Sequence, residues 1–83
     1  MTNKEILEKF FKGEEVVFPL QPLYNIIKSL QEFGYSEDNT ETNGAEMDYW
    51  ITFIKPNHVP IVVSGCVFHD EDIKIYYKDE EED

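Results

Sequence analysis

Residues 46–54 of this chain read EMDYWITFI, a stretch in which apolar side chains recur at every second position. This alternation predicts a β-strand, because successive side chains of a strand point to opposite faces of its sheet. Residues 59–68 and 73–78 are also rich enough in β-branched and apolar side chains to form strands, and turn-forming residues separate the three segments. We therefore expect an antiparallel meander of three strands.

The alternation also divides the apolar side chains of this sheet between two faces. One face is expected to carry Met47, Tyr49, Ile51, Phe53, Ile61, Val63, Ile73, Ile75 and Tyr77. The opposite face is expected to carry Trp50, Ile54, Val62, Cys66, Phe68 and Tyr76. Two helices can cover only one of these faces, so the other is expected to stay partly open.

The first 34 residues of the chain have the apolar spacing of two amphipathic helices. Thr2 and Glu5 have the spacing of a capping box, and the helix that follows is expected to end at Gly13. Residues 22–34 carry apolar side chains at helical spacing, with Pro22 as an early helical residue and Gly34 at the end. These patterns predict a short first helix and a more strongly marked second one.

Two polar or mixed segments are expected to connect these elements. Residues 14–20 are interpreted as a connector that packs under the helices, and residues 36–45 as a solvated loop because their only apolar residue is Ala45. The predicted fold class is α+β, with two N-terminal helices packed on a three-stranded antiparallel β-meander. A chain of 83 residues forms one domain, here residues 1–78, followed by an acidic C-terminal tail at 79–83.

The negative charge is concentrated in the second half of the chain. Residues 1–35 hold five acids and four lysines, a net charge of −1, whereas residues 36–83 hold thirteen acids and three lysines, a net charge of −10. Such asymmetry bears on binding partners more than on fold. It favours a basic protein surface as the partner, and charge repulsion disfavours direct binding to nucleic acid or to anionic membranes.

The acids that flank the predicted strands are the candidate partner-binding residues. In a three-stranded meander, eight carboxylates are expected to converge at one end of the sheet: Glu37, Asp38, Glu41, Glu46, Asp48, Asp70, Glu71 and Asp72. Alternate strand positions such as Glu46 and Asp48 are ~6.6 Å apart, close to the ~7 Å phosphate spacing of a DNA strand. Trp50 and Tyr76 are expected to add aromatic anchors on the open face. The alternative is that these acids only promote solubility and that the rings fill a small second core.

The chain shows no pattern of residues that predicts a metal, a cofactor or catalysis. A calcium-loop frame that starts at Asn39 fails because its twelfth position is Trp50 rather than glutamate, and Cys66, His58 and His69 lack zinc-ligand spacing. Cys66 is expected to be a small buried hydrophobic residue rather than a nucleophile. A single cysteine and the lack of a signal-like segment favour a cytoplasmic protein.

These observations predict a non-enzymatic acidic protein that docks on and inhibits a basic, nucleic-acid-handling protein. DNA mimics, phage-encoded defence inhibitors and nuclease immunity proteins share this size and charge. The alternative is a structural or accessory domain that self-associates as a homodimer through its sheet. Its exposed edge would then be residues 73–78, guarded by Lys74 and Lys78.

Overall fold

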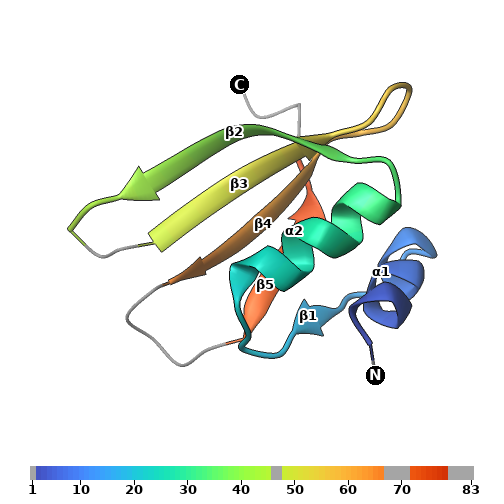
Figure 1. The fold of residues 1–83 in the computed structure, drawn as a ribbon, viewed down its shortest axis with the longest axis horizontal. Coiled ribbons are helices and arrows are strands. Elements are labelled where there is room, and N and C mark those ends of the chain that lie inside the picture. Colours follow the sequence, from blue (N-terminus) through green and yellow to red (C-terminus); the bar gives the residue numbers. More distant parts are fainter. Residues whose placement is uncertain (1, 46–47, 67–71, 79–83) are drawn as a thin grey trace.

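The computed structural model describes residues 2–45, 48–66 and 72–78, and it has an α+β fold with two helices and a five-stranded antiparallel sheet (Figure 1). The strand order across the sheet is β1-β5-β4-β3-β2. In chain order the elements are α1 (Asn3–Phe11), β1 (Val17–Phe18), α2 (Leu23–Glu32), β2 (Ser36–Asn43), β3 (Asp48–Ile54), β4 (Ile61–Cys66) and β5 (Ile73–Tyr77).

Local signals in the sequence set the ends of both helices. The capping box at the start of α1 is confirmed: Glu5 N–H donates to Thr2 Oγ1 at 3.1 Å, and Thr2 N–H donates to Glu5 Oε1 at 2.8 Å. This backbone hydrogen bond from Thr2 lowers the pKa of Glu5. Gly13 and Gly34 follow the helices with φ angles of 98° and 94°, values that favour glycine. Helix α2 itself begins at Leu23, with Pro22 as its N-cap.

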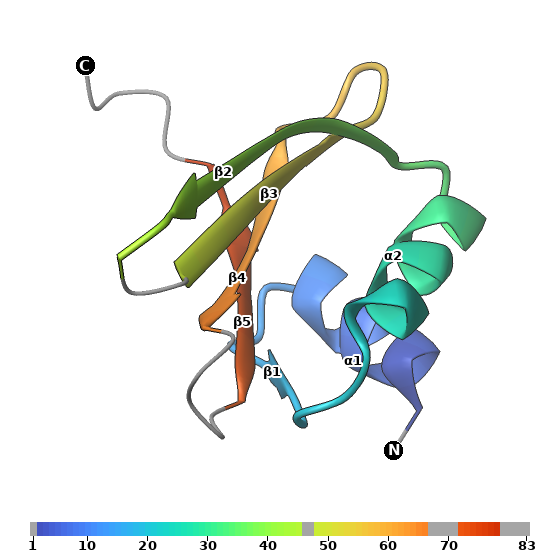
Figure 2. The same cartoon turned by 60° about the vertical axis from the view of Figure 1, so that its left-hand side comes forward.

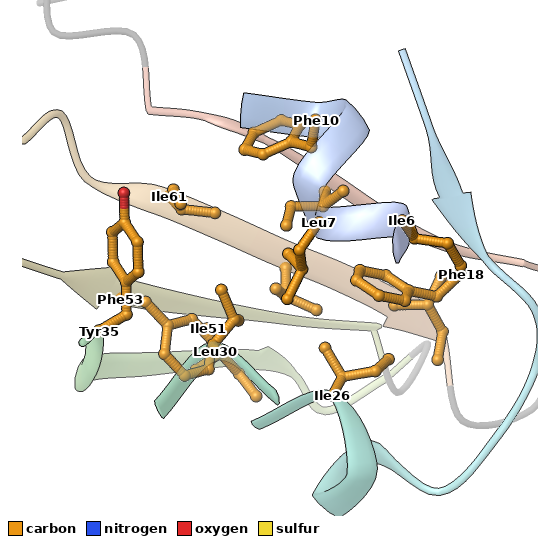
Figure 3. Packing of buried hydrophobic residues seen from close by; sticks show 13 residues of the cluster. Ile6, Leu7, Phe10, Phe18, Ile26, Leu30, Tyr35, Ile51, Phe53 and Ile61 are labelled. Atoms are coloured by element: carbon orange, nitrogen blue, oxygen red, sulfur yellow. The ribbon is translucent and has the colours of Figure 1, made fainter. Parts of the chain in front are cut away.

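Both helices lie on the same side of the sheet, and the hydrophobic core lies between them and the strands (Figure 2). The predicted alternation is confirmed for the described residues, because Ile51, Phe53, Ile61, Val63, Ile73 and Ile75 are all buried in this core. Figure 3 shows Leu7 of α1 and Ile26 and Leu30 of α2 pointing into it. The predictions for Met47 and Phe68 lie outside the described residues.

The prediction of three strands was wrong because two segments interpreted as connections are strands. Residues 36–45, expected to be a loop, contain β2, which pairs with β3 from Ser36–Ile54 to Asn43–Asp48 with a bulge between Glu37 and Asn39. All eight residues of β2 are exposed. Hydrogen bonding along the edge of β3, rather than burial of side chains, therefore holds this strand in place, and such a strand leaves no apolar alternation in its sequence.

The connector at residues 14–20 contributes the other additional strand. Val17 and Phe18 pair with Lys74 and Ile73, and the Phe18 side chain is fully buried. As a result, β5 is not the free edge that the sequence suggested, since β1 covers it at Lys74 and Ile73. Among the described strands, β1 and β2 are the outermost ones.

Candidate docking surface

The face of the sheet opposite the helices carries Trp50 and Tyr76, as predicted. Antiparallel partners share a face, so the strand register arranges this face in rows. One row contains Glu41, Trp50, Ser64 and Lys74, and the next contains Asn39, Thr52, Val62 and Tyr76. We call this surface the open face, since both helices lie on the other side (Figure 2).

Two acids flank Trp50 on the open face. Glu41 pairs directly with Trp50, whereas Asp48 lies two residues before Trp50 on β3 and pairs with Asn43. Glu41 and Asp48 are therefore diagonal cross-strand neighbours, whose backbones lie about 7–8 Å apart. This separation is close to the ~7 Å spacing of successive phosphates on a DNA strand. The end of the β2–β3 pair near Asp48 extends past both helices in Figures 1 and 2.

The expected convergence of eight carboxylates at one end of the sheet was wrong for Glu37 and Asp38. Asp48 and Asp72 do lie toward the same end, because Asp48 pairs with Cys66 and Asp72 directly precedes β5. Glu37, however, pairs with Phe53 near the opposite end of β3, and Asp38 lies at the bulge beside it. The acids of β2 therefore follow the length of an edge strand. Three of the eight lie outside the described residues: Glu46, Asp70 and Glu71.

The hydrogen bonds of the β2 carboxylates come from neutral side chains of the same strand. Thr40 Oγ1 donates to Glu37 Oε2 at 2.7 Å, and Asn39 Nδ2 donates to Glu41 Oε2 at 3.3 Å. Neutral donors orient a carboxylate without cancelling its charge. The edge strand thus presents negative charge and side-chain oxygen atoms to the solvent along its whole length.

Aromatic and aliphatic side chains extend the open face away from these acids. Tyr76 and Ile54 expose 42% and 41% of their surface, which is enough for both to contact a partner, whereas Trp50 is half-buried. Partial burial raises the pKa of the Tyr76 hydroxyl, so Tyr76 adds no charge to this face at neutral pH. Val62 is buried between Thr52 and Tyr76, its partners on the neighbouring strands.

A second surface feature, which the sequence analysis missed, is a hollow of about 610 Å³ at the β3–β4 turn. Its walls include Phe11, Phe33, Tyr35, Lys55, His58 and Tyr77. Burial and, to a smaller extent, the neighbouring Tyr77 raise the pKa of the Tyr35 hydroxyl. The available signal was Tyr35 directly after Gly34, since an aromatic residue just past a helix end often packs back against that helix.

Within residues 2–45, 48–66 and 72–78, no three His, Cys, Asp or Glu side chains are grouped closely enough to hold a metal ion. Cys66 is half-buried at the end of β4. None of the helices found there has the length and apolar character to cross a membrane.

No known protein family, curated protein or solved structure matches this chain.

Proposed function

We propose that this chain is a non-enzymatic acidic binding protein that docks on a basic, nucleic-acid-handling protein and inhibits it. The observation that carries this proposal is the edge strand β2, whose eight side chains are all exposed and which includes Glu37, Asp38 and Glu41. Glu41, Asp48 and Trp50 lie together on the open face, whereas Glu37 pairs with Phe53 and so lies on the side of the helices. The net charge of −11 further strengthens the attraction to a cationic partner.

The physical basis is competition for a cleft that normally holds phosphates. Carboxylates such as Glu41 and Asp48, at nearly the spacing of phosphates, can pair with the lysines and arginines of such a cleft. Long-range attraction speeds the encounter, while a central aromatic side chain such as Trp50 supplies contact area that slows dissociation. Direct binding to nucleic acid is opposed by repulsion between like charges.

Two charge-neutralised variants with the same net charge test this proposal. The docking variant combines Glu37→Gln, Asp38→Asn, Glu41→Gln and Asp48→Asn. The control variant combines Glu8→Gln, Glu14→Gln, Glu15→Gln and Glu32→Gln, all at exposed positions outside the proposed surface. Each set removes four negative charges and changes the net charge from −11 to −7. Affinity capture from a nuclease-treated lysate, with each protein at low and at high salt, identifies partners that depend on the docking surface.

The expected result is a basic, nucleic-acid-binding protein that the wild type and the control variant capture at low salt and the docking variant does not. The purified partner should then lose nucleic-acid binding when the wild type is added, and its association rate should fall steeply with salt. Equal losses in both variants would reduce the effect to net charge and refute a defined surface. A captured partner that keeps full nucleic-acid binding would refute the inhibitory role.

A second candidate function is self-association through the sheet. The open face favours it, because Ile54 and Tyr76 expose apolar surface there and β2 offers an unpaired edge. Sedimentation velocity of the wild type at low and high salt separates the two functions. A dimer that persists or strengthens at high salt supports self-association, since screening reduces the repulsion between two acidic copies.

A further inference from the structure

We propose that the hollow at the β3–β4 turn, which we call the aromatic hollow, binds a small planar aromatic carboxylate. This site is independent of the proposed docking function. The hollow lies where the C-terminal ends of α1 and α2 meet the turn at residues 55–60 and the end of β5. Its volume of about 610 Å³ is within the range of pockets that bind small molecules.

The walls of the aromatic hollow hold several rings in fixed mutual positions. Phe11 stacks on Tyr35 with ring centroids 5.9 Å apart and an interplanar angle of 11°, and it meets the edge of Phe33 at 5.2 Å. Tyr77 stacks on Phe10 at 4.5 Å. Rings that are already packed against one another lose little freedom when a ligand arrives, and they favour a flat aromatic guest through stacking and edge contacts.

A lysine supplies positive charge at the same place. The Lys55 ammonium lies 5.6 Å from the centroid of the Tyr35 ring. Its aliphatic stem passes over Gly34, where an added Cβ would come within 3.2 Å of Lys55 Cε. The missing side chain at Gly34 therefore makes room for the lysine stem, and the ammonium lies beside the Tyr35 ring.

The hollow differs from the rest of this acidic chain in the charge of its polar side chains. His58 also lines it, with its ring 6.3 Å from that of Tyr35 and its Nδ1 2.8 Å from the Pro56 carbonyl oxygen. A carbonyl oxygen only accepts, so this contact requires a proton on Nδ1. No aspartate or glutamate is among the described residues that line the hollow. A single lysine within a chain of net charge −11 suits a monoanion better than a multiply charged phosphate ester.

Titration of the ¹⁵N-labelled 83-residue chain with three ligands of one shape tests the site. The probes are 2-naphthoate, its neutral amide 2-naphthamide, and the cation 2-naphthylmethylammonium. On addition of naphthoate, we expect saturable chemical-shift changes at the backbone amides of Tyr35, Lys55, His58 and Tyr77. The amide should bind about tenfold more weakly, the effect of one charge-assisted hydrogen bond, and the cation more weakly still.

A matched pair of variants assigns the charge selectivity to Lys55. Lys55→Met should weaken naphthoate binding about tenfold and leave naphthamide binding unchanged, because it removes the charge but keeps an unbranched side chain. Lys28→Met removes the same charge from an exposed position on α2 and should change neither affinity. Equal affinities of the wild type for all three ligands, shifts confined to the open face, or no saturation in the millimolar range would each overturn the proposal. The affinities of the wild type for the three ligands test the proposal even if Lys55→Met is unstable.

Discussion

The two sides of this molecule show that one sheet can be held together in two different ways. On the side of the helices, β3, β4 and β5 bury a continuous set of apolar side chains, and Phe53, Ile61 and Val63 have no exposed surface. At one edge of the sheet, β2 adds eight exposed residues and is held by its pairing with β3. Burial thus provides stability at the centre of the sheet, while packing in the core does not restrict the side chains of the edge strand.

The largest expected effect is a difference in stability between two substitutions at adjacent positions of β3, one on each face of the sheet. Phe53→Ala should destabilise the protein by about 3–5 kcal/mol because it leaves a cavity in the core, which is comparable to the whole stability of a small domain. Ile54→Ala, one residue further on and 41% exposed, should cost less than about 1 kcal/mol. Urea denaturation monitored by circular dichroism measures both. Similar losses at the two positions would contradict the division of the sheet into a packed and an open face.

A smaller effect is expected from the difference between a glycine of β4 that contacts a side chain and an exposed glycine that follows β2. Gly65 lies opposite Tyr49 in the β3–β4 pair, and an added Cβ would come within 2.5 Å of the Tyr49 hydroxyl oxygen. Gly65→Ala should therefore cost about 1–3 kcal/mol, as other overpacked sites do. Gly44→Ala is the matched control, since an added Cβ there meets nothing within 4 Å. Equal unfolding midpoints in urea for the two variants would show that Tyr49 moves aside freely.

Alkaline pH provides a third comparison. Burial raises the pKa of Tyr35 and of Tyr49, and Cys66 adds a smaller contribution at Tyr49. A tyrosine whose pKa is raised by folding contributes stability that is complete below about pH 10 and is lost as the pH rises through the folded-state pKa. Tyr35→Phe should therefore flatten the fall in stability above this pH.

The control for this pH effect is Tyr24→Phe. Tyr24 is 67% exposed on α2, so its replacement should leave the alkaline limb of the stability curve as steep as in the wild type. Urea midpoints recorded across the alkaline range decide between these outcomes. An equal slope for Tyr35→Phe and the wild type would exclude Tyr35 as a source of alkaline instability.

The smallest effect on stability is expected at the edge strand. The combination Glu37→Gln, Asp38→Asn and Glu41→Gln should change the free energy of unfolding by less than about 0.5 kcal/mol, or should raise it slightly, because it removes repulsion between exposed like charges. Thermal and urea unfolding measure this change. A loss above about 1 kcal/mol would mean that these acids stabilise the fold, and no binding partner would then be needed to explain their negative charge.

The elements predicted correctly from the sequence are those whose own residues are buried or capped. The spacing of Ile26 and Leu30 indicates the buried stripe of α2, and Thr2 with Glu5 marks the start of α1. β2 escaped prediction because it buries no side chain and therefore has no apolar period. Its β-branched residues Thr40 and Thr42 were the only local hint of a strand.

The predicted position of the acids in the candidate docking surface was wrong for Glu37 and Asp38 of β2. A loop before β3 would have kept all of its acids near Asp48. A strand that runs antiparallel to β3 instead carries Glu37 to the far end, beside Phe53. At ~3.4 Å per residue, the six steps from Glu37 to Asn43 amount to about 20 Å. The aromatic hollow was equally inaccessible from sequence, because it joins residues from α1, α2, the β3–β4 turn and β5.

The sequence by itself determined the two helices, the inward and outward alternation of the central strands, and the excess of negative charge. Each of these depends on residues that are close together in the chain, or on a simple count. The tertiary structure alone decided that the sheet has five strands, where the acids of β2 lie, and how Lys55 meets Tyr35. The physical reason is that strand pairing and ring packing depend on which distant segments become neighbours, and exposed residues leave no record of their neighbours in the local pattern of hydrophobicity.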